Sequence, residues 1–163
     1  MNVFLDTNVV IDFMGEREGF FEDASAIFAM IEAGQIHATT SALTIVNSAY
    51  ILKKAFGSDI MLNKIDALCQ LLDVAPLEKH QLQSAARLRP YDYEDAVQYL
   101  SALPYHPDVI ITRDKKGFKD FDILMMTPAE FVAKAKEYTC ATKPLHHHNY
   151  PAPCKQITLQ GAG

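Results

Sequence analysis

Residues 3–8 read Val-Phe-Leu-Asp-Thr-Asn. Three apolar residues bounded by polar ones predict a short buried strand that ends at the carboxylate of Asp6. A second apolar run, Val109–Ile111, is followed in the same way by Thr112, Arg113 and Asp114. Ligands of a parallel α/β sheet bind outside the carboxyl ends of its strands. We therefore expect Asp6 and Asp114 to meet at one crevice, where they are candidate metal ligands.

The rest of the chain alternates between strand and helix patterns. Short apolar or β-branched runs predict further strands, and apolar residues at helical intervals predict amphipathic helices between them. This alternation indicates an α/β fold with a mainly parallel sheet and helices on both of its faces. The later strands are expected at Ile36–Thr40, Leu72–Leu77, Val109–Thr112 and Ile123–Met126, and the helices at Val9–Phe13, Phe20–Ala33, Ala42–Phe56, Asp59–Leu71, Glu78–Leu88, Tyr93–Leu103 and from Thr127 to about Tyr138.

Several predicted helices begin with capping residues. Ser41, Ser58 and Asp92 each precede a helix, where a side-chain oxygen can accept a hydrogen bond from a free backbone N–H. Thr127 and Glu130, with a proline between them, form the pattern of a capping box.

Composition predicts one domain and a tail. The chain has 163 residues, of which 49% are hydrophobic and 21% charged, as in ordinary globular proteins. We assign the domain to residues 1–138. Residues 139–163 contain three prolines, three adjacent histidines and no Asp or Glu. They show no amphipathic period, which indicates a disordered or non-native tail.

The totals also limit the class of protein. A formal net charge of −5 argues against broad nucleic-acid binding through a basic surface. The three cysteines lack metal-ligand spacing and favour a reducing cytoplasm. The N-terminus does not resemble a signal peptide, and no apolar run has the length of a membrane span, so no membrane partner is expected.

A third acidic position is Asp95, in the first turn of the helix that precedes the Asp114 strand. Carboxylate oxygens are the ligands that Mg²⁺ and Mn²⁺ prefer. A simpler explanation is that Asp95 only stabilises the positive end of the helix dipole and that Asp114 is an ordinary loop carboxylate. Asp6 is harder to explain in that way, because an acid directly behind a buried strand loses its hydration.

Three segments together resemble the successive acidic motifs of the PIN domain family. They are residues 4–8 (FLDTN), 92–98 (DYEDAVQ) and 111–118 (ITRDKKGF). Their order and spacing match, and the resemblance extends over residues 1–138. It implies a three-layer α/β/α sandwich and metal-dependent endoribonuclease activity. Many bacterial members are the toxin of a toxin–antitoxin pair, so the resemblance also implies a small antitoxin partner, a homodimer and a cytoplasmic location.

Carried over residue by residue, the resemblance makes Asp6, Asp95 and Asp114 the metal-binding and catalytic acids. Asn8 would orient Asp6 or a metal-bound water, and Thr112 would contact the site.

One position departs from the family pattern. The family usually has a Glu on the helix after the second strand, whereas here Asn47 lies at about that position. An amide oxygen can still coordinate a cation, but the site loses one negative charge and should bind metal more weakly. Asp122 is a further candidate ligand.

The implied reaction is in-line attack of a metal-activated water on an RNA phosphodiester, with one or two Mg²⁺ or Mn²⁺ ions. The densest basic stretch would guide the RNA, although a solvated loop explains the same charges. Its residues are Arg113, Lys115, Lys116 and Lys119. The alternative function is a catalytically weakened PIN-like module that binds RNA or a protein without cleavage.

Overall fold

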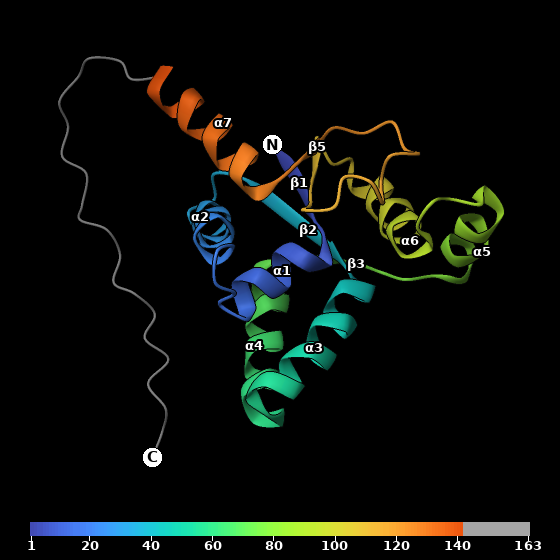
Figure 1. The fold of residues 1–163 in the computed structure, drawn as a ribbon, viewed down its shortest axis with the longest axis horizontal. Coiled ribbons are helices and arrows are strands. Elements are labelled where there is room, and N and C mark those ends of the chain that lie inside the picture. The colour runs from blue at the N-terminus through green and yellow to red at the C-terminus, as the bar shows by residue number, and fades with distance from the viewer. Residues whose placement is uncertain (142–163) are drawn as a thin grey trace.

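The computed structural model describes residues 1–141 of the chain. These residues form five strands and seven α-helices (Figure 1). In chain order they are β1 (Asn2–Leu5), α1 (Thr7–Met14), α2 (Phe21–Glu32), β2 (His37–Ser41), α3 (Ala42–Phe56), α4 (Ser58–Leu71), β3 (Asp73–Ala75), α5 (Lys79–Leu88), α6 (Tyr93–Ala102), a 3₁₀ turn (Leu103–Tyr105), β4 (Val109–Ile111), β5 (Met125–Met126) and α7 (Pro128–Ala141).

The strands form one sheet in the order β3-β2-β1-β4-β5, and every neighbouring pair is parallel. The predicted α/β class is therefore confirmed. β1 lies at the centre and pairs with β2 on one side and β4 on the other. β3 is an edge strand, in agreement with Pro76, which follows it and cannot donate a ladder hydrogen bond.

Helices cover both faces of the sheet (Figure 1). Side chains of a strand alternate between its two faces, and the buried clusters follow this alternation. Val3, Leu5 and Ile111 pack with residues of α1, α2 and α7, whereas Phe4 and Ile110 pack on the other face with Ala102 of α6. The result is an α/β/α sandwich whose core lies on both sides of β1 and β4.

Two of the three predicted serine and aspartate caps are confirmed. The hydroxyl oxygen of Ser41 accepts a hydrogen bond from the Thr44 N–H (3.0 Å), and Asp92 Oδ1 accepts from the N–H groups of Glu94 and Asp95. The expected Ser58 cap is wrong. Gly57, with φ +82°, ends α3 and is also the N-cap of α4, so Ser58 is already helical.

The last helix begins with the predicted capping box. The Thr127 N–H donates to Glu130 Oε2 (2.8 Å), and Thr127 Oγ1 accepts from the Glu130 N–H (3.2 Å). The helix continues to Ala141, three residues beyond its expected end. The rest of the predicted tail lies outside the described residues. Over residues 1–141, no helix combines the length and apolarity that crossing a membrane requires.

Candidate metal centre

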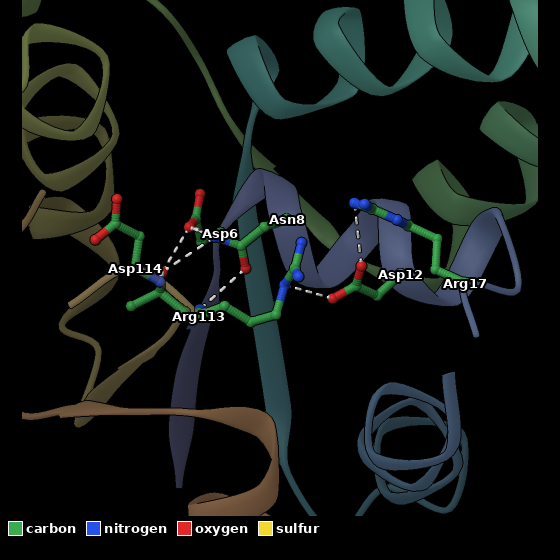
Figure 2. Close-up of polar contacts among 7 residues, drawn as sticks. Asp6, Asn8, Asp12, Arg17, Arg113 and Asp114 are labelled. Atoms are coloured by element: carbon green, nitrogen blue, oxygen red, sulfur yellow. Dashed lines mark hydrogen bonds and ion pairs between the residues drawn. The ribbon is translucent and has the colours of Figure 1, made fainter. Parts of the chain in front are cut away.

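The carboxyl ends of β1 and β4 place Asp6 and Asp114 at one edge of the sheet. Leu5 lies opposite Ile111 in the ladder, and the Asp6 N–H donates to the Ile111 carbonyl (3.1 Å). Figure 2 shows Asp114 beside Asp6 at this edge. The two strand ends therefore meet as the sequence predicted.

Asp6 is buried and held by three side chains. The residue as a whole is only 3% exposed to solvent. Asp6 Oδ2 accepts hydrogen bonds from Thr112 Oγ1 (2.6 Å) and from the Asn8 amide, and Oδ1 accepts from Gln98 Nε2 (3.0 Å). Burial raises the pKa of Asp6, and the hydrogen bonds from Thr112 and Gln98 offset part of that rise. Both oxygens of this carboxylate are thus fixed in direction.

Gln98 belongs to a buried polar network that the sequence analysis missed. Its Oε1 accepts a hydrogen bond from Thr44 Oγ1 (3.1 Å) at the start of α3. Thr44 Oγ1 also lies 3.0 Å from the hydroxyl oxygens of both Thr7 and Ser41. The network therefore ties α3, α6 and the end of β1 together. A glutamine directly after two buried apolar residues of α6 was the available signal.

Asp95 lies in the first turn of α6, where Asp92 caps the helix. Burial raises the pKa of Asp95 to about 7, and the negative charges of Asp6, Asp92, Asp114 and Glu94 add to the rise. These acids come from three separate segments of the chain. Their effect on one carboxylate places them in a single electrostatic neighbourhood, and a cation there would relieve their repulsion.

Glu94 is a fourth acid near the site, and the sequence analysis did not select it. Asn47 Nδ2 donates a hydrogen bond to Glu94 Oε1 (2.8 Å), which joins α3 to α6. Burial raises the pKa of Glu94, the Asn47 hydrogen bond lowers it, and the charge of Asp6 raises it further. A carboxylate from α6 therefore lies beside the amide of Asn47.

The loop after β4 is fixed by hydrogen bonds from its backbone N–H groups to side chains. Asn8 Oδ1 accepts from the Arg113 N–H (3.1 Å), and Thr112 Oγ1 accepts from the Asp114 N–H (2.9 Å). Asp114 Oδ1 in turn accepts from the Lys116 N–H (3.0 Å). Asn8 and Thr112 thus contact both Asp6 and the loop that carries Asp114, in positions suited to the supporting role expected of them.

The structure does not link Asp122 to these acids. It is exposed in the segment before β5, and its charge is not among those that shift the pKa of Asp6, Asp95 or Glu94. Within residues 1–141, no three His, Cys, Asp or Glu side chains are gathered closely enough to form a ready metal site.

The basic loop residues have different surroundings. Arg113 Nε lies 2.8 Å from Asp12 Oδ2, and Lys115 Nζ lies 2.5 Å from Glu130 Oε2. Lys119 Nζ lies over the ring of Tyr91, 4.0 Å from its centroid. Lys116 is exposed. Three of the four cations therefore contact neighbouring side chains of the described chain.

Asp12 is a second buried acid, on α1. It is 0% exposed, and its Oδ1 lies 3.5 Å from Arg17 Nη1, opposite the Arg113 contact (Figure 2). Burial raises the pKa of Asp12, and the charges of Arg113 and Arg17 lower it in part. A charged residue inside the apolar run Val9–Phe13 was the sequence signal for this pairing.

The family model described as the PIN domain matches residues 2–116. No curated protein matches the chain in sequence.

Several solved structures share the fold. The Mycobacterium tuberculosis VapC20, described as a sarcin-ricin loop cleaving toxin, has a TM-score of 0.60 at 12% identity and aligns over 74% of this chain and 96% of its own. VapBC2 from Rickettsia felis, bound to a DNA fragment from its promoter, has a TM-score of 0.58 at 12% identity, over 78% and 98%. A toxin–antitoxin complex from Klebsiella pneumoniae has a TM-score of 0.57 at 19% identity, over 77% and 97%.

Proposed function

Because the chain belongs to the PIN domain family, we propose that it is a metal-dependent endoribonuclease that cleaves RNA phosphodiester bonds. One observation carries the proposal. The paired ends of β1 and β4 bring Asp6 and Asp114 to one edge of the sheet. Beside them, burial raises the pKa of Asp95 to about 7, with a further contribution from the neighbouring negative charges. Acids from distant segments that repel one another at the carboxyl end of a parallel sheet are typical of a cation-binding site.

The cofactor would be Mg²⁺ or Mn²⁺, held by Asp6, Asp95 and Asp114. The donor set fits such an ion, because these side chains offer only hard carboxylate oxygens. Since residues 1–141 hold no ready group of three ligands, the site would be completed as the ion binds. When bound, the ion supplies a water of lowered pKa and stabilises charge on the phosphate.

The chain's own residues would prepare this site. Thr112 and Gln98 hold the Asp6 carboxylate, and Asn8 links it to the loop of Asp114. We propose that Glu94 supplies the negative charge that Asn47 lacks, because the two side chains are hydrogen-bonded to each other. Asn47 would then orient Glu94. Asp122 stays a ligand predicted from sequence alone.

The substrate would approach along the loop after β4. Lys116 and Lys119 are exposed there, and the half-buried Lys115 lies on the same loop. Cations next to an acidic site attract the phosphates of the RNA backbone. The carboxylates can then bind the metal ion. Arg113 instead pairs with the buried Asp12.

We further propose that the protein is a cytoplasmic toxin paired with a small antitoxin. Its similarity in fold to VapC20 and to toxin–antitoxin complexes supports this proposal. Exposed apolar side chains on α3 and α4 offer a surface for a homodimer or an antitoxin. These residues are Val46, Tyr50, Ile51, Ile60 and Leu62.

The second candidate is a PIN-like module that binds RNA or a protein without cleavage. The amide at position 47 favours it, because the α3 position has no carboxylate of its own. One assay distinguishes the two functions. In this assay, single-stranded RNA is incubated with the full chain and Mn²⁺ or Mg²⁺. Cleavage that EDTA and Asp95→Asn abolish supports the nuclease, whereas RNA binding without cleavage supports the module.

A further inference from the structure

Three segments meet behind the acidic site, around the side chain of Arg113. Asp12 of α1 contacts its Nε at 2.8 Å, and the ring of Phe20 packs against the guanidinium with 4.1 Å between Cζ and the ring centroid. The turn that carries Phe20 also brings Arg17 to the other oxygen of Asp12. Arg113 is thus directed along α1, as Figure 2 shows, and its side chain is only 27% exposed.

The contact is one of charge. Within the described residues, neither oxygen of Asp12 accepts a well-aligned hydrogen bond, although both lie within ion-pair distance of a guanidinium. A buried carboxylate is stable in its charged form only beside such a partner. Asp12 and Arg113 therefore hold each other in place, and the loop that begins at Arg113 is anchored to α1.

The anchored residue lies between two residues of the site. The Arg113 N–H donates to Asn8 Oδ1 (3.1 Å), and Asn8 donates to Asp6. On one side of Arg113, Thr112 donates to Asp6 (2.6 Å), and on the other side lies Asp114. A displacement of Arg113 would consequently move the side chains that hold Asp6 and would also move the neighbouring Asp114.

We propose that Arg113 is a positioning residue, which Asp12 and Phe20 hold so that Asp6 and Asp114 keep the geometry needed to bind the metal. In this role Arg113 does not bind RNA phosphate. The inference rests on the proposed function, because it assigns how the same site is kept in place.

The test is the affinity of the full chain for Mn²⁺ without RNA, measured by titration calorimetry, together with RNA affinity in EDTA. Asp12→Asn and Arg113→Gln should each weaken Mn²⁺ binding by about tenfold or more, as loss of supporting residues does at other metal sites. RNA affinity in EDTA should stay within about twofold of wild type. Arg113→Lys should restore part of the Mn²⁺ affinity, because it keeps the charge.

Matched variants keep the result decisive. Lys134→Gln removes an exposed cation from α7 and should leave Mn²⁺ affinity unchanged. Phe20→Leu removes the ring contact without leaving a buried charge unpaired. Phe20→Leu should weaken Mn²⁺ binding by about threefold, which is less than the loss known for residues that hold a ligand directly. This variant can be measured even if Arg113→Gln fails to fold.

Three results would overturn the inference. Equal Mn²⁺ affinities for wild type, Asp12→Asn and Phe20→Leu would exclude a positioning role while leaving the proposed nuclease intact. Loss of RNA affinity in Arg113→Gln, with Mn²⁺ binding unchanged, would make Arg113 an RNA ligand. A wild-type chain that binds no Mn²⁺ would overturn both the proposed function and this inference.

Discussion

Gly117 packs directly against the carboxylate of Asp95. A Cβ atom at position 117 would lie 1.5 Å from Asp95 Oδ2 and 2.6 Å from its Cγ. Real non-bonded atoms do not approach so closely, so only glycine leaves room for Asp95 as it stands. The loop after β4 thus fits around the first turn of α6, and this contact brings the segments of Asp95 and Asp114 together.

Gly117→Ala should therefore displace Asp95 while leaving its charge in place. We expect kcat for RNA cleavage to fall about 10²-fold, as for other displacements of about 1 Å. Steady-state kinetics at saturating Mn²⁺ would measure it. Glu32→Ala, which changes an exposed residue at the end of α2, is the control and should cleave at the wild-type rate. Full activity of Gly117→Ala would show that the position of Asp95 is unimportant.

Glu94→Gln tests whether α6 supplies the fourth negative charge. The substitution keeps an oxygen that can accept from Asn47 and removes only the charge, so the fold should be unaffected. Mn²⁺ affinity should fall about tenfold, and calorimetry would measure it. Glu32→Gln, which removes an exposed charge at the end of α2, should bind Mn²⁺ as the wild type does. Identical affinities for the two variants would remove Glu94 from the site.

The pKa of Asp95 gives a pH dependence with a defined sign. The pKa is about 7 in the folded chain, whereas the ordinary pKa of an aspartate is 3.8, so between these values the folded state binds more protons than the unfolded state. The free energy of unfolding of the metal-free protein should consequently fall as the pH rises from about 4 to 7. Urea unfolding in EDTA at several pH values would measure it, and Asp95→Asn should show a flatter profile.

Metal binding should change in the opposite direction, because a cation competes with the proton on Asp95. Mn²⁺ affinity should rise by up to about tenfold for each pH unit below 7 and level off above it. Calorimetry between pH 5.5 and 8.5 tests this. An affinity that does not vary with pH would mean that Asp95 is not a ligand.

The two serines before helices should differ in stability effect. Ser41→Ala loses a side-chain cap and should lower the free energy of unfolding by about 1 kcal/mol. Ser58→Ala loses no cap hydrogen bond and should stay within about 0.5 kcal/mol of wild type. Urea denaturation of both variants would decide, and equal losses would contradict the assignment of Gly57 as the N-cap of α4.

The sequence was sufficient for features that depend on local pattern. Asp6 and Asp114 follow apolar strands, and the caps at Ser41 and Asp92 stand directly before amphipathic helices. Parallel strands then bring the two acids to one edge of the sheet. Ser58 was misassigned because Gly57 next to it can supply the left-handed turn between two helices.

Features that depend on three-dimensional contact could not be predicted. Glu94 and Asn47 are 47 positions apart, and nothing in either segment indicates the other. The loop that carries Arg113 is rich in charge, which suggested a surface role for this side chain, yet it is directed toward Asp12. Buried polar residues within apolar runs, such as Asp12 and Gln98, were the only local signs of these contacts.

We propose that Asp6, Asp95 and Asp114 hold a metal ion that the protein uses to cleave RNA. The most direct measurement is single-turnover cleavage of a mixed single-stranded RNA pool by the full chain in saturating Mn²⁺, with Asp95→Asn and an EDTA sample in parallel. We predict cleavage by the wild type and none above background in the other two. Equal background cleavage in all three samples, from wild-type protein that is folded and binds RNA, would contradict the claim.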